Sequence, residues 1–99
     1  MIYARNIKFE ILDGKDKEFT TLFNNEILPL LKKQEGFREE MVMVKEHVGV
    51  GISLWNSKES LEKYNTTVYP DVAKKLTPVL KGQPMIDVYH VTGGTINMN

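Results

Sequence analysis

The sequence predicts an α+β domain in which strands and helices follow one another in the order βαββαβ. Three patterns predict it: alternation of apolar and polar side chains, apolar residues at helical spacing, and glycine or proline at the breaks between segments. Alternation marks the strands, which we expect at residues 2–12, 37–47, 48–55 and 85–92. A chain with this order folds most simply as a ferredoxin-like, four-stranded antiparallel sheet with both main helices on one face.

The first strand is followed by a long helix. The strand places Ile7, Phe9 and Ile11 on one face and Asn6, Lys8 and Glu10 on the other. Apolar residues then recur at helical spacing over residues 15–35, until Gly36 ends the helix. Because Pro29 lacks a backbone donor, we expect a kink or broken turn near Asn25.

The two middle strands form a hairpin, and the second of them has one nearly bare face. Bulky residues alternate there with small ones, which are Gly49, Gly51 and Ser53. A strand face without bulky side chains allows another part of the chain or a ligand to approach closely, and the more common partner is a helix or neighbouring backbone.

The second helix is interrupted by Pro70. It begins at an Asn56 or Ser57 cap, with Glu59 in capping-box position relative to Asn56, and resumes over Asp71–Leu80. Its buried stripe consists of Leu61, Tyr64 and Val68.

Composition and charge exclude several classes of protein. The 99 residues include 13 basic and 13 acidic side chains and no cysteine, so disulfides, thiolate metal sites and a nucleic-acid-binding charge pattern are not expected. No apolar run reaches the roughly 20 residues that span a bilayer, and no signal peptide precedes Ile2. We therefore expect one cytoplasmic domain over residues 1–99, with neither nucleic acid nor membrane as a partner.

The sheet face away from the helices is expected to be apolar. Alternation allows either Met41, Met43, Tyr89 and Val91 or Val42, Val44, Ile86 and Val88 on that face. Burying such a face would offset the cost of association, so we predict a homodimer joined sheet to sheet.

Several segments resemble the dimeric α/β-barrel family that includes antibiotic-biosynthesis monooxygenases and haem-degrading monooxygenases. They are the first strand with its Asp-Gly turn, Gly36-Phe37, Leu54-Trp55-Asn56-Ser57-Lys58-Glu59 and the last strand. The resemblance implies a dimeric α/β barrel and a monooxygenase-like enzyme without a cofactor. Such enzymes act on a small aromatic or quinone-like molecule, whose deprotonated form gives an electron to dioxygen. The alternative is a non-catalytic ligand-binding or dimeric assembly module of the same fold.

The haem-degrading members of this family provide a competing interpretation. Asn6 matches the asparagine that they carry in the first strand. Their second-helix tryptophan and axial histidine fall at Tyr64 and Lys74, however, and a protonated lysine gives no lone pair to iron. The resemblance therefore implies no haem, and we expect no cofactor.

Five residues supply the groups that a cofactor-independent site needs. We predict His90 and Tyr64 as catalytic residues and Asn6, Trp55 and Tyr69 as substrate-binding residues, because aromatic rings stack on a ring and polar groups hold its oxygens. Each also has a structural explanation. Trp55 and Tyr64 can be packing residues, Tyr69 can cover a pocket mouth or fill the gap beside Pro70, and His90 can be a hydrogen-bonded core residue.

The second histidine and the acidic residues predict no further site. His47 lies in a charged turn and is expected to be solvated. Two histidines this far apart, with no paired ligand at helical spacing, do not form a metal site, so no metal is expected. We do expect a hollow between the sheet and the helices.

Overall fold

The computed structural model describes residues 1–98 and confirms the predicted α+β order. The strands are β1 (Tyr3–Glu10), β2 (Phe37–Lys45), β3 (Val48–Trp55) and β4 (Met85–His90). The first helical region consists of α1 (Asp16–Leu22), the π turn η1 (Phe23–Ile27) and α2 (Leu28–Lys32). The second consists of α3 (Lys58–Thr67), α4 (Tyr69–Leu76) and the 3₁₀ turn η2 (Thr77–Val79).

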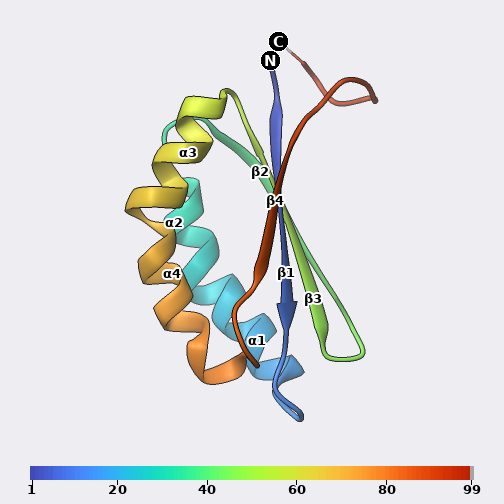
Figure 1. Ribbon diagram of the computed structural model, residues 1–99, viewed down its shortest axis with the longest axis vertical. Coiled ribbons are helices and arrows are strands. Elements are labelled where there is room, and N and C mark those ends of the chain that lie inside the picture. Colours follow the sequence, from blue (N-terminus) through green and yellow to red (C-terminus); the bar gives the residue numbers. More distant parts are fainter. Residues whose placement is uncertain (99) are drawn as a thin grey trace.

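The molecule has two layers, with all helices on one side of an antiparallel sheet (Figure 1). The strand order is β2-β3-β1-β4, so the two strands of the hairpin lie on one side of β1 and the last strand lies on the other. This is the ferredoxin-like arrangement that the order of elements predicts. Both β2 and β4 are edge strands.

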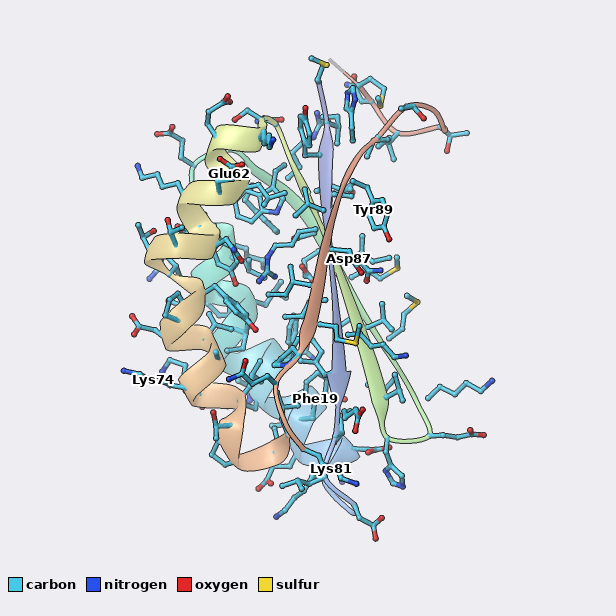
Figure 2. All side chains as sticks on the ribbon, in the orientation of Figure 1. Phe19, Glu62, Lys74, Lys81, Asp87 and Tyr89 are labelled. Carbon is cyan, nitrogen blue, oxygen red and sulfur yellow. The ribbon has the colours of Figure 1, made fainter. Side chains whose placement is uncertain are left out.

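Strand pairing determines which residues share a face of the sheet. Arg5 lies opposite Ser53 and Val88, while Asn6 lies opposite Ile52 and Asp87. Because Ile7 and Phe9 are buried in the core, the face with Arg5 is the one under the helices. The face with Asn6 is open, and Asp87 and Tyr89 point away from the helices there (Figure 2).

The open face carries the first of the two alternative apolar sets. Met41, Met43 and Tyr89 are about half exposed, at 52%, 46% and 55%. Their neighbours Val50 and Ile52 are partly buried in the same face. The alternative set lies on the helix side, where Val42 and Ile86 pack against the core.

The core lies between the sheet and the helices. Phe9, Phe19 and Trp55 are almost fully buried, and Figure 2 shows Phe19 directed between the layers. The bare face of β3 receives the Phe19 ring of α1 closely, as expected. A Cβ at Gly49 would lie 3.2 Å from the Phe19 ring. The glycine therefore allows α1 to approach the sheet.

The first helix departs from α geometry where a break was expected. The π turn spans Phe23–Ile27 and includes Asn25, just before Pro29. Pro29 has no N–H to donate, and the backbone N–H of Leu28 bonds to the carbonyl of Phe23, five residues back and not four as in an α-helix. The helical region ends at Lys32, three residues before the predicted end at Glu35, because the chain turns toward Gly36 with its positive φ of 80°.

The second helix is capped by Ser57 and not by Asn56. The Ser57 hydroxyl accepts a hydrogen bond from the backbone N–H of Ser60 at 3.1 Å, so the predicted capping box with Glu59 does not form. The interruption falls at Val68, and helix resumes at Tyr69, two residues earlier than predicted, because Pro70 occupies the first turn, where its missing N–H costs nothing.

Candidate functional site

A row of three polar residues crosses the helix-covered face of the sheet. Arg5 on β1 pairs with Ser53 on β3, and Ser53 pairs with Glu40 on β2. Residues paired in this way point to the same side, so both long side chains extend over the small Ser53. The row places a cation and a carboxyl group inside an otherwise apolar layer.

The Arg5 side chain is held from the helix side. Arg5 is only 3% exposed, and its Nε and Nη2 atoms donate hydrogen bonds to Oδ1 of Asn65, at 3.1 and 3.0 Å. Its guanidinium carbon lies 4.4 Å from the centre of the Tyr69 ring and 5.3 Å from that of Tyr64. Ring faces attract cations, and burial lowers the pKa of Arg5 from a value so high that the group stays charged.

Glu40 is the unusual member of the row. Its Oε1 atom is buried and has no hydrogen-bond partner among the described residues. Burial raises the pKa of Glu40 to about 8, although the positive charge of Arg5 opposes this shift. No ion pair joins Arg5 to a carboxylate within residues 1–98. Glu40 is therefore mostly protonated at neutral pH, and Arg5 is a buried cation without an anionic partner.

Gly51 makes room for the carboxyl group. A Cβ on Gly51 would lie 3.1 Å from both Glu40 Oε1 and Ile7 Cγ2. The bare face of β3 thus has two occupants of different kinds: the Phe19 ring at Gly49 and the Glu40 carboxyl at Gly51.

Arg5, Glu40, Ser53, Tyr64 and Tyr69 line one small chamber, together with Val72 and a wall of apolar side chains, Ile7, Phe9, Phe23, Ile27 and Leu31. Its volume is about 10 Å³, close to the least that holds one water molecule. The hollow predicted between the sheet and the helices is therefore present but far smaller than a substrate pocket. Large side chains account for this, since Phe9 and Phe23 fill the space beneath the helices.

A larger groove lies beside the chamber, between α4 and the segment that leads into β4. Its volume is about 480 Å³, and it is lined by Tyr69, Ala73, Lys74, Leu80, Pro84 and Ile86, among others. This volume is within the usual range of small-molecule sites. Tyr69 lines both the groove and the chamber, so its ring lies at the junction between them.

Two of the predicted site residues, Tyr64 and Tyr69, lie together in the chamber wall. Their ring centres are 6.4 Å apart. Burial raises the pKa of Tyr64 to about 12 and also raises that of Tyr69, so both phenols remain neutral hydrogen-bond donors at neutral pH.

Trp55 lies behind Tyr64 and does not line the chamber. It is fully buried, its Nε1 donates a hydrogen bond to the Ser53 hydroxyl at 2.8 Å, and its ring lies 5.1 Å from that of Tyr64. These contacts fix the positions of Ser53 and Tyr64, which do line the chamber.

Asn6 and His90 lie apart from this chamber. Asn6 is on the open face, and β1 pairs with β3 in continuous register, so no bulge turns Asn6 toward the helices. Its Oδ1 atom is buried without a partner among the described residues. His90 is exposed at the end of edge strand β4, where its ring stacks on Tyr3 with the centres 5.0 Å apart.

Sequence reasoning missed Arg5, Glu40 and Asn65. A signal was present for the first two, because Arg5 alternates in register with Ile7 and Phe9, and Glu40 with Val42. Burying a charged residue on an apolar strand face reduces stability, so such a residue is a candidate for a functional role. Asn65 gave no comparable signal, since its role depends on how α3 crosses β1.

The turn between β2 and β3 contains the other histidine. Glu46 and His47 both have positive φ, at 48° and 68°, as a two-residue hairpin turn requires. His47 is half exposed, and its Nδ1 lies 2.9 Å from Oδ1 of Asp16. That hydrogen bond raises the pKa of His47.

Residues 1–98 contain neither a cluster of metal-binding side chains nor a membrane-spanning helix. No three histidine, cysteine, aspartate or glutamate side chains are grouped as metal ligands would be. None of the helices in this part of the chain combines the length and apolar character needed to cross a membrane.

Comparison with known proteins identifies similar structures. No family model matches the sequence, and no curated protein matches it either. Among solved structures, a cofactor-independent oxygenase, SnoaB from Streptomyces nogalater, matches with a TM-score of 0.79 and 13% identity over 94% of this chain and 95% of that one. The monooxygenase ActVA-Orf6 of Streptomyces coelicolor, in complex with nanaomycin D, matches with a TM-score of 0.78 and 13% identity over 96% and 91%.

The similar structures also include a conserved protein from Methanosarcina mazei Go1, with a TM-score of 0.75 and 19% identity over 93% of this chain and 94% of that one. Identities this low carry information on fold and not on reaction. The chain therefore has the fold of antibiotic biosynthesis monooxygenases, a fold that a cofactor-independent oxygenase shares with a protein of unknown function from Nitrosomonas europaea.

Proposed function

We propose that this protein is a cofactor-independent, monooxygenase-like enzyme that acts on a small aromatic or quinone-like molecule at the Arg5–Glu40 chamber. The observation that carries the proposal is the buried Arg5 cation beside a Glu40 carboxyl oxygen without a partner. Polar groups left unpaired inside an apolar layer reduce stability, and perturbed titratable groups of this kind are concentrated at functional sites.

The residues around the chamber match the chemistry of an aromatic ligand that carries oxygen. The rings of Tyr64 and Tyr69 offer stacking surfaces, and the Arg5 guanidinium offers donors to a ligand oxygen. In the reaction we propose, a phenol and dioxygen give a quinone and water, so the substrate supplies all the electrons. The solved structure of ActVA-Orf6, which has the same fold, holds the ligand nanaomycin D, so this fold accommodates a small-molecule ligand.

The ligand ring enters through the groove between α4 and β4. The groove is large enough for a bicyclic ring, whereas the chamber admits little more than an oxygen atom. Tyr69 separates the two, and it lies at the break between α3 and α4. A shift of the Tyr69 ring would join them, with the ligand ring in the groove and its oxygen next to Arg5.

Oxygen consumption with 1-naphthol as the probe tests this function. We expect uptake above the rate of spontaneous oxidation, with a quinone as product. Arg5→Met should lower the rate at least about tenfold by removing the cation next to the ligand oxygen. Thr21→Ala, on the exposed surface of α1, is the matched control and should leave the rate unchanged. Wild-type protein without uptake, or Arg5→Met with full activity, would contradict the proposal.

The predicted catalytic residues are tested in the same assay. Tyr64→Phe removes a hydroxyl group from the chamber wall, and His90→Ala removes the exposed ring that stacks on Tyr3. A loss of rate in His90→Ala alone would place the reaction at the end of β4 and not in the Arg5–Glu40 chamber.

The open face favours a second candidate function, a dimeric assembly or ligand-binding module. Met41, Met43, Met85 and Tyr89 expose large apolar side chains there. We propose that two copies join through this face, in which case Asn6 and its unpartnered oxygen lie in the interface. The dimer is compatible with the enzyme, because the Arg5–Glu40 chamber lies on the opposite side of the sheet.

Sedimentation analysis tests the dimer. We expect a dimer for the wild-type chain and a monomer for Met43→Glu, since the substitution buries a charge in the interface. Thr21→Glu adds the same charge on the helix surface and should remain dimeric. A monomeric wild-type chain at micromolar concentration would contradict the proposal. A dimer that consumes no oxygen with any phenol would favour the assembly module.

A further inference from the structure

We infer that the ligand is held as its oxyanion between the Arg5 guanidinium and the protonated Glu40 carboxyl, and that ionised Glu40 takes up the hydroxyl proton when a neutral substrate binds. This inference rests on the proposed function and specifies its ligand as an acidic phenol or enol. It concerns the first step only, before any reaction with dioxygen.

The geometry supplies both halves of an oxyanion site. Arg5 is fixed by two hydrogen bonds to Asn65 and by the Tyr69 ring, so its charge stays in place. Glu40 reaches the same chamber from the other side of Ser53, with Oε1 buried and unpartnered among the described residues. A ligand oxygen between them would gain an ionic hydrogen bond from Arg5 and would give Oε1 the partner it lacks.

The proton transfer is balanced. The substrate O–H bond breaks, an O–H bond forms on the Glu40 carboxylate, and no atom is oxidised or reduced. The total charge of ligand, Glu40 and Arg5 is the same before and after the step. The same final state forms when a substrate that is already ionised binds to protonated Glu40.

Few other groups near Glu40 titrate near neutral pH. Arg5 faces it from β1, Tyr64 from α3 and Tyr69 from α4, and the first helical region contributes only apolar side chains to the chamber. The raised pKa values of both tyrosines keep them neutral over the range in which Glu40 titrates. A carboxylate whose conjugate acid has a pKa of about 8 is also a stronger base toward a phenolic proton than an ordinary carboxylate.

Binding of 4-nitrophenol as a function of pH tests the inference, because its anion is coloured and its neutral form is not. For the wild type we expect affinity that is highest between the pKa of the probe and that of Glu40. Above about pH 8 it should fall about tenfold per pH unit, as Glu40 loses the proton that the complex needs. The Glu40→Gln variant should keep its full affinity there.

Two controls accompany this measurement. Glu39→Gln changes the adjacent exposed carboxylate and should retain the wild-type pH profile. The methyl ether 4-nitroanisole has no proton to give and should bind with no dependence on pH. If Glu40→Gln fails to fold, calorimetry of the wild type in two buffers serves instead. Above about pH 8 we expect proton uptake approaching one per bound 4-nitrophenol.

The outcomes separate the two proposals. Equal affinity of wild type and Glu40→Gln above pH 8, or binding without proton uptake, would overturn the role of Glu40 and leave the proposed function standing. No binding of 4-nitrophenol or 4-nitroanisole to the wild type would overturn the proposed site itself, and the inference with it.

Discussion

The two faces of the sheet carry similar numbers of apolar residues but place their polar residues differently. On the open face, polar side chains such as Lys8 and Asp87 are exposed, and the methionines between them are half exposed. On the covered face, Arg5, Ser53 and Glu40 lie in one row beneath aromatic side chains. An exposed polar group costs little, whereas the buried covered row is costly and calls for a functional explanation. Asn6 is the exception on the open face, because its Oδ1 is buried without a partner among the described residues, and the proposed dimer interface would cover it.

The largest expected effect is the loss of folding stability when a large side chain is removed from the covered face and not from the open face. Phe19→Ala should destabilise the fold by about 3–5 kcal/mol, because the ring is fully buried against Gly49. Met41→Ala on the open face should change the free energy of unfolding by less than about 1 kcal/mol at low protein concentration, where a dimer is dissociated. Urea denaturation checks both. Similar losses of stability in the two variants would contradict the difference in packing between the two faces.

The next effect concerns the cost of the covered carboxyl group. The pKa of Glu40 is raised from an ordinary 4.5 to about 8 in the folded chain, so the unfolded chain loses this proton first. The contribution of Glu40 to stability therefore falls between about pH 4.5 and pH 8 and is constant above that range. Relative to the wild type, Glu40→Gln should gain up to about 4 kcal/mol of folding stability between pH 5 and pH 9. Thermal denaturation at both pH values measures the gain, and Glu39→Gln should show none.

A smaller effect tests the space around the carboxyl group. Gly51→Ala places a methyl group 3.1 Å from Glu40 Oε1 and Ile7 Cγ2, which should cost about 1 kcal/mol and displace Glu40 from the chamber. The pKa of Glu40 should then move back toward its ordinary value as the carboxyl becomes solvated. A variant with an unchanged pKa would show that Gly51 does not determine where Glu40 lies.

The smallest expected effect is on the pKa of His47, in the turn between β2 and β3 that contacts the start of α1. Asp16 raises the pKa of His47 mainly through their hydrogen bond. The protonated form is therefore favoured in the folded chain, and this small stabilisation is lost as the pH rises through the raised pKa. In Asp16→Asn, NMR titration should give a lower pKa for His47 than in the wild type, and an unchanged pKa would contradict the role of Asp16.

The order of the elements could be predicted from the sequence, whereas the site could not. Alternation in β1 and β3 identifies strands without further information, and Pro29 and Pro70 mark the two breaks in the helices. The sequence does not determine the twist and crossing of the helices, which bring Asn65 onto Arg5 and leave Asn6 on the other side. The predicted site was assembled from residue types, and types do not specify which face of a strand is covered.

Charged residues at apolar strand positions predict the location of the site better than the distribution of aromatic residues does. Arg5 and Glu40 stand in the apolar register of their strands, and that mismatch is visible without a structure. Asking which charged residues violate a buried pattern would have found both of them.

The most direct test of the account is the pKa of the Glu40 side chain, measured by following its carboxyl carbon in a ¹³C NMR titration. Because the carboxyl is desolvated beside an arginine that it does not pair with, we predict a pKa of about 8. A pKa near the ordinary 4.5 would mean that Glu40 is solvated or paired with Arg5, and would contradict the account of the covered face as a site.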